Sequence, residues 1–193
     1  MPGDNLTRVE TQDSKSHVDV SSYDVALDLT TGEETFASTT TVTFSAKAGA
    51  STFIDAFTRT VHAVTLNGRS LDPAVVSDGV RILLDDLAEQ NVLVVVADAE
   101  YTNTGEGLHR FVDPVDGELY LYSQFEVPDS RRMFAVFEQP DLKASFQFTV
   151  TAPAAWQVVS NSPTPTPVAK KGSTGSADSV ATWAFEAPPR ISS

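Results

Sequence analysis

The sequence predicts an all-β domain, an antiparallel sandwich built from several sheets. About ten short runs alternate apolar and polar residues with the period of two that a half-buried strand requires. Clusters of Gly, Pro, Asn and Asp separate these runs, and no convincing amphipathic helix interrupts them. All 193 residues are expected to belong to this single β domain.

The first strands are expected to form a hairpin. Residues 1–18 are polar and predict a loose leader, or a tail that follows an edge of the domain. Every second residue of 22–29 is apolar, which predicts a half-buried strand. Residues 36–44 are expected to pair with this strand across a turn, and their β-branched threonines suit a pleated surface.

The middle of the chain predicts further short strands, over residues 52–57, 60–66 and 80–84. Asn67-Gly68 is the strongest hairpin signal in the sequence. Residues 92–96 within the run 91–101 are apolar on both faces, which predicts a central strand covered on both sides.

The second half mixes loops and strands. Residues 103–117 are rich in glycine and predict a long loop, and the acids at 113–118 lack calcium-loop spacing and therefore predict a turn. Further strands are expected over 120–125, 145–150, 156–160 and 180–185. The last two are expected to pair as a hairpin around a long Pro/Gly/Ser loop at 162–179.

Composition restricts the possible partners. The formal net charge of −13 argues against nucleic acid and anionic membranes, which require basic surfaces. It is compatible with a cationic ligand, although surface charge serves solubility first. The chain has no cysteine, no signal-peptide pattern and no apolar run long enough to cross a bilayer, so we expect a cytoplasmic location.

The stretch 118–148 concentrates charged and amide groups among aromatics, which is costly to bury without fixed partners. Gln124 and Glu126 point to the same side if the strand persists, and such a pair can clamp a primary ammonium group. A peptide N-terminus, with a pKa of about 7.7–8.0, supplies that cation. The alternative is that Glu126 pairs with Arg131 or Arg132 to brace a loop, and spacing alone favours this ion pair.

Catalytic motifs are missing from the sequence. The zinc-hydrolase motif H-E-x-x-H, the G-x-S-x-G elbow and a phosphate-binding glycine loop do not occur. The three histidines lie far apart, so no metal site is predicted in this chain. The 193 residues alone do not predict an enzyme.

The motifs of the central stretch resemble the N-terminal domain of the aminopeptidase N family of zinc metallopeptidases, most closely the actinobacterial type. The family pattern runs Q-x-E, A-R-R-x-F-P-C-x-D-E-P and K-A-x-F. Here it reads Gln124-Phe-Glu126, then residues 130–140 (SRRMFAVFEQP), then Lys143-Ala-Ser-Phe146. The departures from the pattern include Ser130 for Ala, Ala135 for Pro, Val136 for Cys and Gln139 for Glu, and none touches the Gln-x-Glu pair.

The resemblance implies a saddle-like N-terminal β domain of a zinc-dependent aminopeptidase, a hydrolase that removes N-terminal residues from peptides. Glu126 would bind the substrate α-amino group, Gln124 would line the pocket for the first side chain, and Arg131 and Arg132 would brace the loop. Zinc and the catalytic residues would belong to a catalytic domain after residue 193, which carries the family's G-x-M-E-N and H-E-x-x-H motifs.

Two expectations follow from this resemblance. The fragment alone should be inactive, and an apolar patch of Phe125, Met133, Phe134 and Phe137 should be exposed where the catalytic domain covers it. The competing hypothesis is a non-catalytic β-sandwich module that uses the same loop to bind or scaffold a protein partner.

Overall fold

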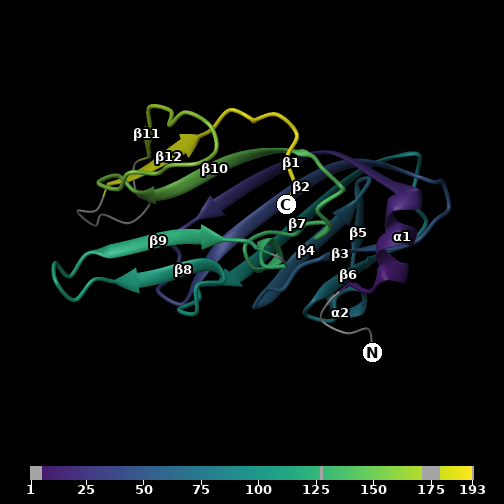
Figure 1. Cartoon of the computed structure of the whole chain (residues 1–193), viewed down its shortest axis with the longest axis horizontal. Coiled ribbons are helices and arrows are strands. Elements are labelled where there is room, and N and C mark those ends of the chain that lie inside the picture. The colour runs from purple at the N-terminus through teal and green to yellow at the C-terminus, as the bar shows by residue number, and fades with distance from the viewer. Residues whose placement is uncertain (1–5, 127, 171–178, 193) are drawn as a thin grey trace.

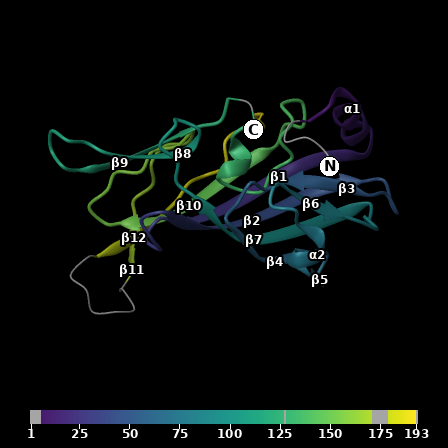
Figure 2. The same cartoon turned by 90° about the horizontal axis from the view of Figure 1, so that it is seen from below.

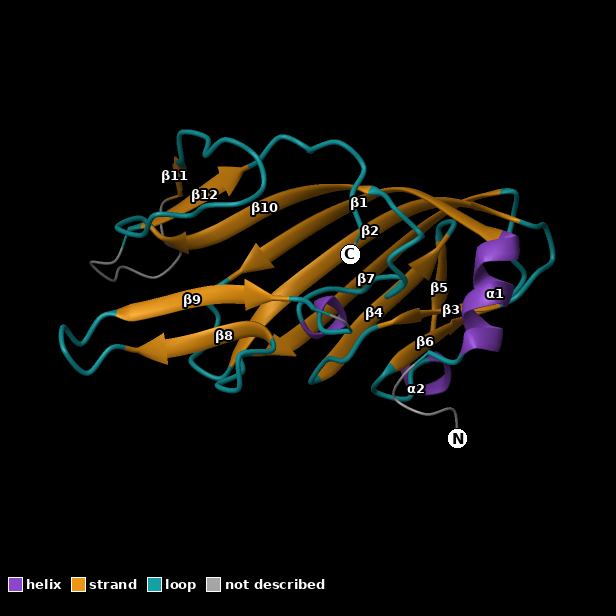
Figure 3. Cartoon of the chain, viewed as in Figure 1, coloured by secondary structure: helices purple, strands orange, loops and turns teal. Residues whose placement is uncertain are grey.

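A twisted eight-stranded sheet carries the fold (Figures 1 and 3). The computed structural model describes residues 6–126, 128–170 and 179–192. In spatial order, the strands of the large sheet are β11 (Val168–Lys170), β12 (Val180–Ala184), β10 (Ser145–Pro153), β1 (Val18–Asp28), β2 (Thr35–Ala46), β7 (Gln90–Glu100), β4 (Thr60–Leu66) and β5 (Arg69–Leu71). Two smaller sheets pair β3 (Thr52–Asp55) with β6 (Arg81–Leu84), and β8 (Gly107–Val112) with β9 (Leu119–Gln124). The predicted all-β, multi-sheet fold is confirmed.

The two hairpins predicted most clearly are present. β1 and β2 pair antiparallel, and buried residues alternate along both strands except at an irregularity between Val20 and Ser22 of β1. β4 and β5 pair across Asn67 and Gly68, which both have positive φ angles, 52° and 80°. Positive φ at both central residues is the requirement of a type I′ turn, so this dipeptide fixes the hairpin.

Strand β7 is central, as predicted, but only one of its faces is covered, whereas cover on both faces was predicted. It lies between β2 and β4, and its residues alternate between buried and more exposed positions. Leu93, Val95 and Ala97 face the core, whereas Val92 is 46% exposed. The run of valines misled the prediction because valine also suits the open face of a pleated sheet.

The C-terminal strands pair differently from the prediction. Residues 154–160 form no strand, and β12 pairs with β10 instead of with 156–160. β10 also pairs with β1, and this pair is parallel in an otherwise antiparallel sheet. The loop expected at 162–179 contains β11, which pairs with β12, while residues 171–178 lie outside the described chain.

A helix, α1 (Arg8–His17), occupies the segment expected as a loose leader. Thr7 and Glu10 form a capping box in which each side chain accepts a hydrogen bond from the other residue's backbone N–H, at 3.3 and 2.8 Å. Glu10 also pairs with Arg81 at 2.8 Å, which fixes the helix to β6. The T-x-x-E signature at its start was the sequence signal for this helix. A second, shorter helix, α2, spans Pro73–Val76.

The hairpin β8–β9 projects from the end of the molecule opposite to α1 (Figures 1 and 2). β8 lies inside the stretch 103–117 that was predicted as a long loop. Residues 113–118 form the turn between the two strands, as predicted. β8 was not predicted because it has only six residues and follows a glycine-rich stretch, which is typical of a loop.

Candidate functional site

The stretch after β9 crosses the inner face of the large sheet as a buried segment, residues 129–139. It begins with a 3₁₀ turn, η1 (Ser130–Arg132). Three hydrogen bonds join its backbone to side chains of β1 and β2: Ser38 Oγ to Met133 O (2.9 Å), Ala135 N–H to Thr40 Oγ1 (3.2 Å) and Phe137 N–H to the Tyr23 hydroxyl oxygen (3.0 Å). Buried backbone groups need such partners, so the sheet fixes the path of this segment.

The partners on the sheet were overlooked in the sequence. Ser38 and Thr40 lie in phase with Phe36 and Val42 on the buried face of β2. Polar residues at core positions of a strand are a signal that another segment must satisfy them. That segment is 129–139.

The same segment is also joined to β3. Asp55 and Val136 exchange two backbone hydrogen bonds of 2.9 Å, and Phe57 N–H donates to Arg131 O at 2.9 Å. One side of the segment therefore completes the small sheet, while its other contacts fix it to the large sheet.

A buried carboxylate, Glu138, closes the segment back on its own start. It accepts hydrogen bonds from Ser130 Oγ at 2.5 Å and from Arg131 N–H at 2.7 Å, and its residue is 3% exposed. Burial raises the pKa of Glu138, while the hydrogen bonds from Ser130 and Arg131 act in the opposite direction. We call this arrangement of Ser130, Arg131 and Glu138 the carboxylate lock.

A second buried carboxylate, Asp55, lies beside the lock. Burial raises its pKa, and the nearby Arg81 guanidinium partly offsets that rise. Its Oδ1 lies 3.5 Å from Arg81 Nε and 3.8 Å from Arg131 Nη1. A cavity of about 320 Å³ opens beside these groups, and Asp55, Arg131, Glu138 and Gln139 contribute to its lining.

The two arginines of the motif make different contacts. Arg132 pairs with Asp129 at 2.8 Å and with Glu106 at 3.3 Å, and its guanidinium carbon lies 4.6 Å from the centre of the Phe57 ring. Arg131 is buried near Asp55. Within the described residues neither forms an ion pair with Glu126, so the geometry does not reproduce the bracing pair that spacing favoured.

Gln124 and Glu126 lie together where β9 ends. The strand does not continue through Glu126, yet the Glu126 N–H donates to Gln124 Oε1 at 3.0 Å, which holds the amide beside it. Both residues are exposed. The Glu126 carboxylate has no hydrogen-bond or ion-pair partner among the residues that the structure describes, so it can accept a cationic ligand.

The prediction of an exposed apolar patch in the isolated domain is largely wrong. Met133, Phe134 and Phe137 belong to segment 129–139 and their side chains are buried. Phe134 packs edge-on against Phe125 and Phe146. Phe125 alone remains partly exposed. Three exposed aromatic residues, Phe111, Tyr120 and Tyr122, lie instead on hairpin β8–β9, and Phe57 is exposed elsewhere.

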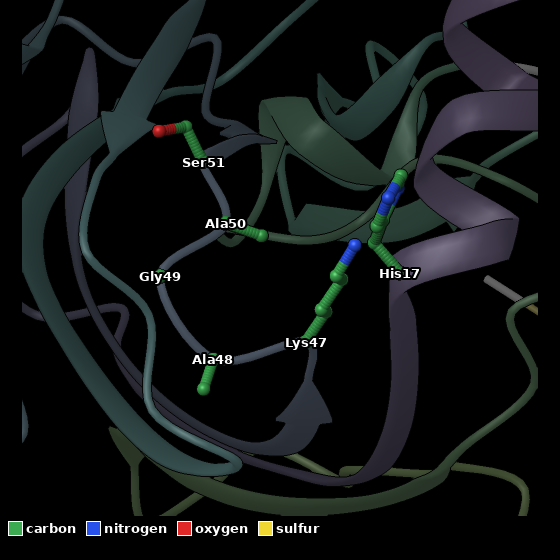
Figure 4. A pocket seen from close by; sticks show the side chains of 6 residues that line it. All are labelled: His17, Lys47, Ala48, Gly49, Ala50 and Ser51. Atoms are coloured by element: carbon green, nitrogen blue, oxygen red, sulfur yellow. The ribbon is translucent and has the colours of Figure 1, made fainter.

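A second cavity, of about 330 Å³, lies away from this segment (Figure 4). Its lining consists of His17 and residues 47–51, with Lys47 and His17 as its charged and titratable side chains. Neither Gln124 nor Glu126 contributes to it.

The described residues offer no zinc site. No group of three or more His, Cys, Asp or Glu side chains in that part of the chain gathers as metal ligands. Likewise, none of its helices combines the length and apolar character of a membrane-spanning segment.

Comparisons with known proteins agree with the motifs. The family described as the Peptidase M1 N-terminal domain matches residues 20–193. An aminopeptidase N of Streptomyces lividans is 57% identical over 197 residues, which cover 100% of this chain and 22% of that protein. An aminopeptidase N of Acetobacter pasteurianus is 36% identical over 121 residues, or 52% of this chain and 34% of that protein.

A solved structure shares the fold. A mutant M1 zinc metallopeptidase from Deinococcus radiodurans matches with a TM-score of 0.66 at 20% identity, over 87% of this chain and 39% of the other. The chain thus spans less than a quarter of the Streptomyces relative and less than half of the solved chain. With motifs, fold and sequence in agreement, the chain belongs to the family of peptidase M1 N-terminal domains.

Proposed function

We propose that this chain is the N-terminal domain of a zinc-dependent aminopeptidase, and that its Gln124–Glu126 loop anchors the α-amino group of a peptide substrate. The relatives that bear the name aminopeptidase N support the reaction class. The observation that carries the site is the exposed Glu126 carboxylate, which has no partner among the described residues and is held beside an amide. A primary ammonium offers three donors to such a pair.

Arg131, Arg132 and Glu138 fix the loop in this proposal. The contacts of Arg132 with Asp129 and Glu106 join the loop to the base of β8, and the carboxylate lock holds η1. The side chain of Gln124 then borders the space for the first substrate side chain. Substrate recognition depends on such pre-positioned groups because a flexible loop would have to be ordered at each binding event.

The zinc ion belongs, in this proposal, to a catalytic domain outside these residues, where it supplies Lewis-acid chemistry for peptide hydrolysis. The 193-residue chain should therefore hydrolyse no aminoacyl anilide and bind no zinc stoichiometrically. Peptide N-termini and the protein's own catalytic domain are the expected partners. A cytoplasmic location stays a prediction that cell fractionation can test.

The experiment is a substitution in the full-length protein. Glu126→Ala should raise KM and lower kcat/KM for an aminoacyl p-nitroanilide by roughly 30- to 5,000-fold, because loss of one partner of a desolvated charge pair costs about 2–5 kcal/mol. Glu186→Ala, at another exposed glutamate, is the matched control and should leave the kinetics unchanged. Unaltered kinetics in Glu126→Ala would remove the anchoring role, and a full-length protein without zinc-dependent hydrolysis would favour the scaffold module.

A further inference from the structure

Hairpin β8–β9 presents one open face of aromatic side chains. The register pairs His109 with Tyr122 and Phe111 with Tyr120, so these four residues share one face. Phe111, Tyr120 and Tyr122 are 45%, 49% and 52% exposed. The opposite face carries Leu108 and Leu121, which pack against the core.

Three of the four rings on this face, those of His109, Tyr120 and Tyr122, contact other groups of residues 105–122. The His109 and Tyr122 rings stack with centroids 4.7 Å apart, and Gly105 N–H donates to His109 Nδ1 at 3.0 Å. The Tyr120 hydroxyl donates to Asp116 Oδ2 at 2.8 Å. Rings held in this way lose little conformational freedom when they are covered, which favours an interface.

The face continues directly into the proposed substrate site. The register places Gln124 opposite Gly107, two residues beyond Tyr122 and on the same face of the ribbon. A domain that completes the site around Gln124 therefore also lies along the aromatic side chains. The Streptomyces relative leaves ample chain for such a domain, since this chain covers 22% of it.

We infer that the face formed by His109, Phe111, Tyr120 and Tyr122 is the surface on which the catalytic domain of the full-length protein packs, and that this packing sets the position of Gln124. The inference rests on the proposed function, which supplies that domain as the occupant. The turn at the tip carries Asp113, Asp116 and Glu118, so the covering surface should be apolar with basic residues at its rim. The same acids, with the net charge of −13, disfavour a second copy of the chain.

Site-specific photocrosslinking in the full-length protein tests the contact. A benzoylphenylalanine at position 111 should, on irradiation, form an intramolecular crosslink to a peptide that lies beyond residue 193. The same probe at position 75, a 75% exposed valine of α2, measures background capture. Capture at position 111 no greater than this background, or capture of a second copy only, would overturn the inference.

A kinetic test asks whether the contact positions Gln124. The double substitution Phe111→Ser with Tyr120→Ser in the full-length protein should raise KM by roughly 2- to 30-fold, the range of coupling between distant groups, with little change in kcat. Val75→Ser is the matched control. An unchanged KM would overturn the positioning role.

The two proposals can fail separately. Crosslinking needs no peptidase activity, so a missing crosslink refutes the docking surface and leaves the Glu126→Ala experiment as it stands. Conversely, unaltered kinetics in Glu126→Ala refute the amine anchor, whereas the crosslink still reports which surface covers the hairpin.

Discussion

At the scale of single residues, Glu126 is distinguished by what it does not touch. Most acidic side chains near the buried segment are engaged: Glu138 with Ser130, Asp129 with Arg132, and Asp55 near two arginines. Glu126 has no such partner within the described chain and lies exposed at the end of a strand. A charge left open beside fixed neighbours is the arrangement expected of a ligand-binding group.

The charge of Glu126 can be separated from its shape. In the full-length protein, under the proposed function, Glu126→Gln keeps an oxygen acceptor but loses the negative charge, so it should lower kcat/KM for a free-amine substrate almost as much as alanine does. A substrate whose α-amino group is acetylated carries no cation. The ratio of kcat/KM for the free-amine substrate to kcat/KM for its N-acetylated form should therefore also fall in this variant. Paired kinetics on the two substrates measure this, and undiminished discrimination in the glutamine variant would contradict a charge-based anchor.

At the scale of elements, the base of hairpin β8–β9 and the turn η1 meet at Gly107. This glycine has a φ of +61°, and a Cβ added there would lie 2.8 Å from the Cβ of Arg132. Real side-chain carbons do not approach so closely, so only glycine allows the strand to pass the turn. The hairpin and the loop that carries Glu126 are therefore positioned together.

Two glycine substitutions separate conformation from contact. Gly117 has a similar φ, +72°, but an added Cβ would meet nothing within 4 Å. Gly117→Ala should therefore lower the free energy of unfolding by about 1–2 kcal/mol, the cost of a left-handed residue, and Gly107→Ala by about 1–3 kcal/mol more through overpacking. Urea denaturation of both variants measures the difference, and equal losses would show that the contact with Arg132 is relieved easily.

At the scale of the whole molecule, the core combines apolar packing with buried charge. The rings of Tyr23 and Phe146 stack at 4.6 Å, and Phe44 meets Phe137 edge-on at 5.4 Å. Close to them lie Asp55 and Glu138, whose pKa values are both raised by burial. The free energy of unfolding should therefore depend on pH through these two buried carboxyl groups.

The sign of that dependence follows from linkage. Because the folded-state pKa of Glu138 lies above its unfolded value of about 4.3, its stabilising contribution is complete below that pH and is lost as pH rises through the folded-state pKa. Glu138→Gln does not titrate. The stability of the variant relative to wild type should therefore improve as pH rises from about 4, by at most about 1.4 kcal/mol per pH unit.

Urea denaturation at a series of pH values measures this difference, and Glu186→Gln, at an exposed position, is the control that should run parallel to wild type. Parallel curves for Glu138→Gln as well would contradict the raised pKa. A constant offset between the Glu138 curves is expected in addition, since the amide replaces one acceptor oxygen of the carboxylate lock.

Most strands could be predicted because their cause is local. Alternation predicted most of β1 and β2 but not their exact bounds, and Asn67-Gly68 forced a tight turn by its backbone preference alone. The motif Gln-x-Glu predicted the candidate site, because its two polar residues lie only two positions apart in the chain. β8 and α1 were not predicted, although the cause is local in both. The residues before β8 are rich in glycine, which is typical of a loop, and α1 begins with a capping box in an otherwise polar segment.

By itself the sequence determined the β class, the main hairpins and the family, because period, turn chemistry and motif are properties of neighbouring residues. Tertiary structure alone decided that β10 pairs parallel with β1, that Ser38 and Thr40 hold a segment about 95 residues away in the chain, and that Arg132 turns to Asp129 and Glu106. These pairings join residues far apart in sequence, and their choice depends on which buried polar groups each packing arrangement satisfies. The open carboxylate of Glu126 follows from that choice: the arginines that could have neutralised it are paired elsewhere.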